Sequence, residues 1–224
     1  ASDGICDVGL SIHLLGSPRM ERAGAPVDAP RGHKAWGLLA YLLRSRIPPS
    51  REGLATLLFP EADDPLGALR WTLSEVLRRL GEHAGLGGDP LWLTLPPGTF
   101  VDIDVLSRGS WVEAVALPGL GHGLLDGLVF RSSPGFQMWL DNERRHVAGS
   151  TSAVLHQAAL ALLARGEASG AAHQASELVR LNPYEENAHV LFVRCLRAAG
   201  DSGAAARHVE ACTEHFRTEL GTEP

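Results

Sequence analysis

The sequence predicts a mainly α-helical protein with small β-sheets, built as two domains. Three observations predict this fold class. Period-2 strand patterns are confined to the first 104 residues, amphipathic helical stretches lie between them, and alanine-rich helical patterning fills the remainder. The length of 224 residues suits two ordinary domains, and the 45% apolar, 21% charged composition is typical of a chain with a packed core.

The first predicted domain, residues 1–104, opens with a small sheet. Leu10, Ile12 and Leu14 alternate with polar residues, which is the pattern of a half-buried strand. Ala23-Gly24 then turns the chain toward a further short strand at residues 25–27.

Three helices are expected next, from their caps and from the spacing of their apolar residues. The first has Trp36, Leu39 and Ala40 on one face and ends before Pro48-Pro49. Ser50 caps a short second helix over residues 51–59. Asp64 and Pro65 begin a third helix over residues 65–80. The inward face of this third helix is predicted to be Leu66, Leu69, Leu73, Val76, Leu77 and Leu80.

A β-hairpin is predicted after the third helix. Its strands are residues 91–95 and 99–103, joined by Pro96-Pro97-Gly98. The order of sheet, three helices and hairpin is that of a winged helix-turn-helix, in which the third helix enters the major groove of DNA.

The second predicted domain, residues 105–224, is all-helical. One helix begins at Ser133-Pro134 and another covers about residues 153–164. Residues of the same kind then recur 34 positions apart, which is the period of a tetratricopeptide repeat. The pairs are Leu162 with Leu196, Ala164 with Ala198, Gly166 with Gly200, Ala171 with Ala205, and Ala172 with Ala206.

Several short segments, in this order, carry a resemblance to a known family. They are residues 14–16 (LLG), 49–52 (PSRE), 68–70 (ALR), 73–74 (LS), 101–104 (VDID), 139–144 (WLDNER), 181–186 (LNPYEE) and 219–224 (ELGTEP). With them the chain resembles the bacterial transcriptional activator family of the antibiotic-regulatory-protein type, an OmpR-like winged helix followed by a tetratricopeptide-like activator domain. The resemblance implies a cytoplasmic activator that binds promoter repeats in double-stranded DNA, as a homodimer or in tandem, and contacts RNA polymerase.

The candidate DNA-binding residues form two groups. The outer face of the third helix presents Trp71, Ser74 and Arg78 and is flanked by Arg70 and Arg79. The junction of the first two helices presents Arg44, Arg46 and Arg51. Ordinary surface charge is the alternative interpretation of these arginines. Glu75 is expected on the flank of the reading face, where a carboxylate would repel phosphate or accept a hydrogen bond from a cytosine amino group.

Charge and motif content exclude other classes of function. The net charge is −6, and each predicted domain has 10 basic and 13 acidic side chains, so neither has a basic field. No nucleotide-binding, hydrolase or metalloprotease motif occurs, so we expect no enzyme, no catalytic residues and no cofactor. No secretory signal is visible, and the polar residues within 146–164 make that stretch a poor membrane span, so no membrane partner is expected.

Two alternatives remain open at this point. His208, Cys212 and His215 have the spacing of metal ligands on one helix, although an apolar stripe with a buried thiol explains them better and no metal is expected. Cys6, Cys195 and Cys212 are odd in number and widely spaced, which fits a reducing cytoplasm.

The alternative function is a protein-interaction module within a longer regulator, in which a degenerate winged helix precedes a peptide- or domain-binding helical groove.

Overall fold

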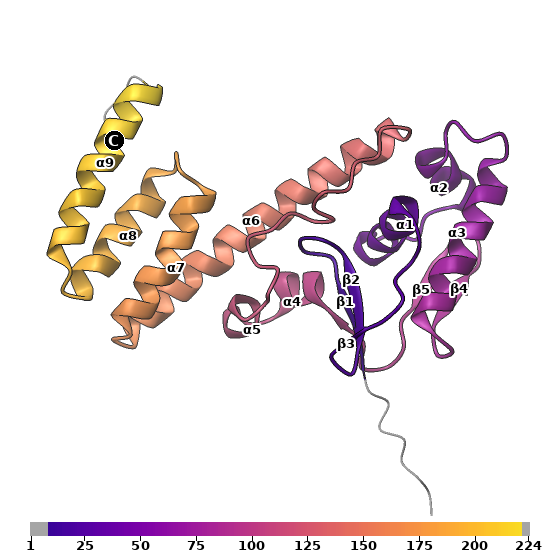
Figure 1. Cartoon of the computed structure of the whole chain (residues 1–224), viewed down its shortest axis with the longest axis horizontal. Helices are drawn as coiled ribbons and strands as arrows, with labels where there is room; N and C mark the ends of the chain where they lie inside the picture. Colours follow the sequence, from indigo (N-terminus) through magenta and orange to yellow (C-terminus); the bar gives the residue numbers. More distant parts are fainter. Residues whose placement is uncertain (1–8, 221–224) are drawn as a thin grey trace, which may run out of the picture. The chain divides into compact units, whose positions relative to one another are not determined.

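The chain forms two compact units in a computed structural model that describes residues 9–220 (Figure 1). Unit 1 takes the chain up to Asp104 together with His122–Val147, and unit 2 takes Val105–Gly121 together with the chain from Ala148. The end of the first segment of unit 1 coincides with the expected change of fold at residue 104, and the chain then returns to this unit at 122–147. Cys6, the start of the chain and the closing residues 221–224 lie outside the described part.

Unit 1 contains a four-stranded sheet in the order β3-β2-β1-β6. Its strands are β1 (Leu10–His13), β2 (Arg19–Arg22), β3 (Ala25–Pro26) and β6 (Phe100–Val101). The predicted turn between β2 and β3 is confirmed, because Ala23 and Gly24 have φ values of 59° and 74°. In the described residues β6 is the strand that pairs parallel to β1, placing Val101 beside Ile12.

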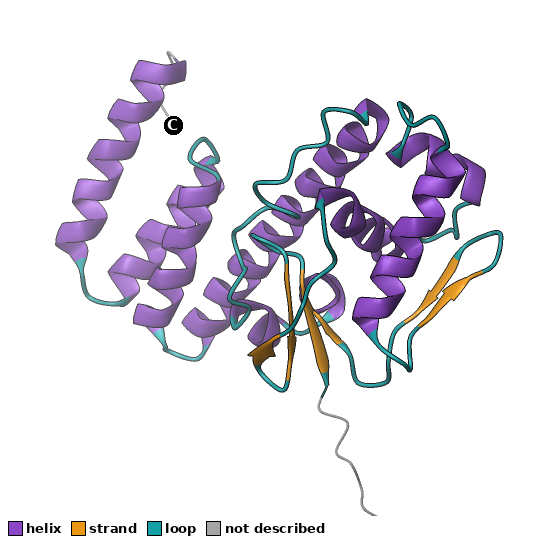
Figure 2. Ribbon diagram, turned by 45° about the vertical axis from the view of Figure 1, so that its right-hand side comes forward, coloured by secondary structure: helices purple, strands orange, loops and turns teal. Residues whose placement is uncertain are grey.

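The predicted hairpin of residues 91–95 and 99–103 is wrong. β5 (Trp92–Thr94) pairs antiparallel with the earlier strand β4 (Gly85–Gly87), whereas β6 joins the other sheet. Beside β1, Val101 is 4% exposed in the core, and the burial of its side chain stabilises this pairing. The β4–β5 hairpin lies beside the third helix, as Figure 2 shows, and is therefore the wing of this unit.

The three predicted helices of unit 1 are present as α1 (His33–Arg44), α2 (Arg51–Leu58) and α3 (Pro65–Leu80). Both predicted caps are confirmed: Ser50 Oγ accepts from Gly53 N at 3.1 Å and Asp64 Oδ1 accepts from Gly67 N at 2.8 Å. Leu66 differs from the prediction, because it is 44% exposed in the first turn of α3. Leu69, Leu73, Val76 and Leu80 are buried, as predicted, whereas Leu77 is half-buried. Thr72 and Glu75 complete the buried face.

Two charged side chains of unit 1 form hydrogen bonds with backbone groups of segments that are distant in the sequence. Asp102, at the start of α4 (Asp102–Arg108), is 2% exposed and accepts from the backbone N–H groups of Leu14 and Leu15 at 2.9 Å and from that of Ile103 at 2.8 Å. Burial raises the pKa of this carboxyl, and the backbone hydrogen bonds oppose that shift. Arg144 donates to the carbonyls of Leu124, Leu125 and Leu128 at 2.8–3.0 Å. Both residues belong to segments that carry the family resemblance, so those segments stabilise the fold.

The helix that begins at Ser133-Pro134 continues without a break as α6 (Pro134–Ala164, 31 residues), so the expectation of two helices here is wrong. No proline interrupts it after Pro134, and Gly149, the glycine in its interior, costs only about 1 kcal/mol relative to alanine. By length and apolar composition, α6 is the one helix of the described residues that could span a membrane. Its residues Phe136, Leu140 and Leu155 are at most 2% exposed within the protein.

Unit 2 confirms the 34-residue repeat in its backbone. Its helices are α5 (Trp111–Val115), the second half of α6, α7 (Ala168–Leu181), α8 (Glu186–Ala198) and α9 (Ser202–Leu220). Gly166 and Gly200 have φ values of 78° and 82° and follow α6 and α8, the first helices of the two hairpins. The next residue after each glycine donates to the carbonyl five positions back, Leu162 or Leu196, at 2.9 and 3.0 Å. The two helical hairpins therefore turn in the same way.

We expect the buried small residues of the repeat to be intolerant of enlargement. Ala171 and Ala205 are 0% and 1% exposed, whereas Ala206 is exposed. Ala205→Leu should therefore lower the free energy of unfolding by about 1–3 kcal/mol through overpacking. Ala206→Leu is the matched control and should change it by less than about 0.5 kcal/mol. Equal urea midpoints for the two variants would contradict the packing described.

Candidate nucleic-acid interface

The outer face of α3 presents a row of exposed side chains. Arg70 and Arg78 have side chains that are 68% and 62% exposed, and Trp71 is 63% exposed. Ser74 lies between them on this face, and its Oγ donates to Arg70 O at 3.0 Å. The structure thus brings four of the five predicted α3 residues together, opposite the face that packs into the core.

The prediction that Glu75 lies on the outer flank is wrong. Its side chain is 5% exposed and accepts from the guanidinium groups of Arg78 and Arg79 and from Arg31 N at 3.3 Å. These contacts offset the cost of burying a carboxylate. The hydrogen bond from Arg78, followed by that from Arg79, lowers the pKa of Glu75 to about 2. Because the Glu75 carboxylate is paired with Arg78 and Arg79, it presents no free negative charge at the outer face.

Arg79 is not part of the exposed row. Its side chain is 8% exposed and pairs with Glu75 at 3.0 Å and with Asp28 at 2.8 Å. Hydrogen bonds to Glu75 and then to Asp28 raise its pKa. Arg79 therefore links α3 to the segment after β3.

The Glu75 cluster predicts a specific acid sensitivity. Because the folded pKa of about 2 lies below the ordinary 4.5, the stabilisation from Glu75 is present above pH 4.5 and is lost as the pH falls toward 2. Glu75→Gln should lower the urea midpoint at pH 7 and should reduce the further loss between pH 4.5 and pH 2. Glu52→Gln, at an exposed position, is the control. Parallel acid profiles for Glu75→Gln and the unmodified chain would contradict this assignment.

The structure does not gather the three junction arginines around one point. Arg44 Nε pairs with Glu143 at 2.8 Å, and both side chains are largely buried. Arg51 Nε donates to Gly88 O at 2.8 Å and its backbone N–H donates to Asp89 at 3.0 Å, which ties α2 to the wing. Arg46 is exposed between α1 and α2. Arg44 and Arg51 thus stabilise contacts between segments of unit 1, and Arg46 remains on the surface.

Residues that the sequence did not single out lie next to Trp71. A hollow of about 480 Å³ beside it is lined by Arg31, Lys34 and Phe59 among others. Lys34 Nζ lies 4.7 Å from the centroid of the Phe59 ring, and burial lowers its pKa. Arg31 and Lys34 are far from α3 in the sequence, so only the packing of α1 against α3 reveals them.

The residues of the metal alternative have other partners. His208 Nε2 lies 3.0 Å from His189 Nδ1, and His215 stacks on Tyr184. Burial raises the pKa of the Cys212 thiol, which disfavours the thiolate that a metal needs. Across residues 9–218, no group of three His, Cys, Asp or Glu side chains is placed to hold a metal ion.

Comparisons with known proteins identify the family to which the chain belongs. The sequence profile described as the bacterial transcriptional activator domain matches residues 103–224. A search of curated proteins gave no match. Among solved structures, the chain is similar to Mycobacterium tuberculosis EmbR in complex with a low affinity phosphopeptide, with 18% identity and a TM-score of 0.64. The alignment covers 96% of this chain and 62% of the EmbR chain, and at this identity it shows a shared fold. Since the profile covers more than half of the residues, the chain belongs to the bacterial transcriptional activator domain family of transcription regulators.

Proposed function

We propose that the chain is a DNA-binding transcriptional activator in which α3 enters the major groove and the β4–β5 hairpin serves as the wing. The observation that carries the proposal is the exposed row of Arg70, Trp71, Ser74 and Arg78 on a helix whose opposite face is buried. Arginine is the side chain most often found bidentate on guanine in the major groove, and an exposed tryptophan suits sugar or thymine-methyl contact.

Glu75 acts as a positioning residue for Arg78. A guanidinium has five N–H donors in a planar fork, so Arg78 can keep its bond to Glu75 and offer the remaining donors to a base edge. Arg70 lies 3.6 Å from Asp64, with both side chains 68% exposed. An exposed pair of this kind contributes little to stability, so a phosphate can replace Asp64 as the partner of Arg70.

The charge balance favours assembly on repeated sites. The net charge of −6 gives no long-range attraction to DNA, and the exposed arginines of α3 supply few phosphate contacts. We infer that two copies, as a homodimer or in tandem, bind promoter repeats in the cytoplasm and that RNA polymerase adds affinity. Family membership supports the polymerase contact and the activator role.

The test is a gel-shift series on three duplexes, each with and without RNA polymerase. They carry one half-site, two half-sites one helical turn apart, and the same two half-sites with an extra half turn. We expect the in-phase pair to bind most tightly and polymerase to increase occupancy. Equal binding to all three duplexes, with occupancy unchanged by polymerase, would contradict the proposal.

A further inference from the structure

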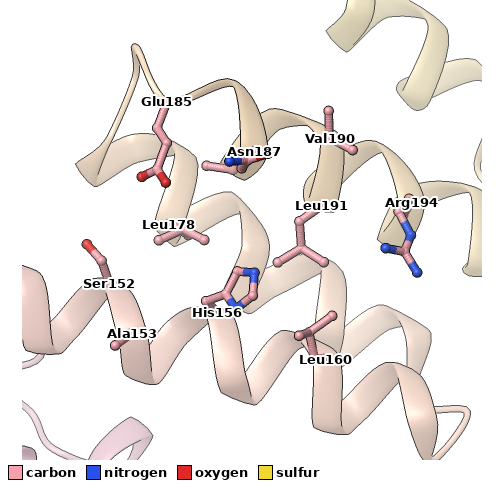
Figure 3. A pocket seen from close by; sticks show the side chains of 11 residues that line it. Ser152, Ala153, His156, Leu160, Leu178, Glu185, Asn187, Val190, Leu191 and Arg194 are labelled. Atoms are coloured by element: carbon pink, nitrogen blue, oxygen red, sulfur yellow. The ribbon is translucent and has the colours of Figure 1, made fainter.

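A groove of about 600 Å³ runs along unit 2 between the second half of α6 and α8, with Leu178 of α7 at its base (Figure 3). Its base is apolar, because Leu178 and Leu191 are 3% and 4% exposed members of the core of unit 2. Its rim is also partly apolar: Leu160 is 39% exposed and Val190 is 50% exposed. Large apolar side chains therefore remain in contact with water inside a concave surface, where a ligand can cover them.

Four exposed polar side chains of the groove make no side-chain hydrogen bond or ion pair with another described residue. They are His156, Glu185, Asn187 and Arg194, which line the groove without a hydrogen bond or an ion pair of their side chains. By contrast, Ser152 at the end of the groove accepts from Asn182 at 2.9 Å. An imidazole, a carboxamide and two opposite charges are thus available to a ligand.

The two charges stand at opposite ends of the groove. Glu185 precedes α8 and Arg194 lies nine positions later on it, which corresponds to about 13.5 Å at 1.5 Å per residue. An extended chain covers this distance in about four residues at 3.3 Å each. A helix would bring about nine residues over the same distance, more than a groove of this size encloses.

We propose that this groove binds an extended peptide segment of a partner protein that has an acidic and a basic side chain four residues apart. The acidic side chain pairs with Arg194 and the basic one with Glu185. An apolar side chain between them packs against Leu160 and Leu191, and Asn187 and His156 hydrogen-bond the peptide backbone. The site belongs to unit 2, so it does not depend on DNA binding by α3.

The probes are three capped five-residue peptides, titrated into the full 224-residue chain and followed by amide chemical shifts. Two have the sequences Glu-Ala-Leu-Ala-Arg and Arg-Ala-Leu-Ala-Glu, because the direction of the bound chain is to be determined, and the third replaces both charged residues by glutamine. We expect one charged peptide to give saturable shifts at Leu160, Asn187 and Leu191. Its affinity should exceed that of the neutral peptide by about fivefold or more, as for two partly exposed ion pairs.

Charge-reversal variants separate binding from a structural effect. Arg194→Glu should weaken the preferred charged peptide about tenfold, and Glu185→Lys combined with Arg194→Glu should transfer the preference to the reversed peptide. Arg197→Glu is the matched control, since Arg197 is exposed on α8 but does not line this groove. Duplex DNA affinity should be the same for Arg194→Glu and Arg197→Glu, so failure here is distinguishable from failure of the DNA-binding proposal.

Three results would overturn the assignment. In the first, neither charged peptide saturates the groove shifts. In the second, Arg194→Glu and Arg197→Glu change the peptide affinity equally. In the third, the same amide shifts change with protein concentration alone, which would identify a second copy of this chain as the occupant.

Discussion

Replacing Arg70 and Arg78 together by alanine should weaken binding to a promoter duplex by about 2–4 kcal/mol, roughly 30- to 1000-fold. Arg78 is expected to account for the larger part, because loss of a guanine contact costs about 1–3 kcal/mol and loss of a phosphate contact costs less. Both side chains are more than 60% exposed, so their removal leaves the apolar core intact. Because Arg78→Ala also removes one of the two guanidinium partners of the buried Glu75, urea unfolding of the double variant is measured alongside. A competition assay with specific and mixed genomic duplexes measures the effect.

Arg217→Ala is the control for this pair of substitutions. Arg217 is an equally exposed arginine on α9, where its partner is Glu214 in the same helix. Its loss removes one positive charge without touching α3. If Arg217→Ala weakens binding as much as either α3 substitution, the effect reflects net charge and the placement of α3 in the major groove is wrong.

Asp102→Ala should be the most damaging single change to the stability of unit 1. It leaves the buried N–H groups of Leu14, Leu15 and Ile103 without their acceptor, and each unsatisfied buried group costs about 1–3 kcal/mol. Allowing for relaxation, we expect a loss of about 3–5 kcal/mol in the free energy of unfolding.

Two further variants test whether Asp102 stabilises unit 1 as a hydrogen-bond acceptor. Asp102→Asn retains one acceptor oxygen and should cost less than Asp102→Ala. Asp104→Ala removes a carboxylate two positions later that is only half-buried, and it should cost little. If Asp102→Ala and Asp104→Ala unfold at the same urea concentration, Asp102 does not hold the end of β1.

Local signals in the sequence were sufficient for much of the fold. The caps Ser50 and Asp64 act on groups within three residues, so their side chains alone predict where α2 and α3 begin. The 34-residue repeat is equally local, because Gly166 and Gly200 each end a helix through bonds to the preceding turn.

Contacts between distant residues could not be predicted in the same way. The parallel pairing of β6 with β1 joins positions about 90 residues apart, and nothing near residue 100 distinguishes it from a hairpin strand. Arg44 was expected at a phosphate but pairs with Glu143, 99 positions later.

Glu75 and Arg79 illustrate the limit of a helical wheel. A wheel gives the direction of a side chain and places Glu75 at the edge of the buried face, but it does not include neighbours on other segments. The backbone N–H of Arg31 and the carboxylate of Asp28 come from outside α3 and allow the Glu75–Arg79 pair to be buried. The exposed row of Arg70, Trp71, Ser74 and Arg78 depends on direction alone, and the wheel predicted it correctly.

The central claim is that α3 binds duplex DNA through its exposed arginines, and a salt titration of duplex affinity tests it most directly. Each neutralised phosphate adds about −0.9 to the slope of log K against log salt. We expect a slope of about −2 for the unmodified chain, from phosphate contacts of Arg70 and of one exposed neighbour, Arg31 or Arg46. The slope of the Arg70→Ala, Arg78→Ala variant should be smaller by about 1, because Arg78 contacts a base edge and not a phosphate. An affinity that does not change with salt, or a slope identical in the two proteins, would contradict the claim.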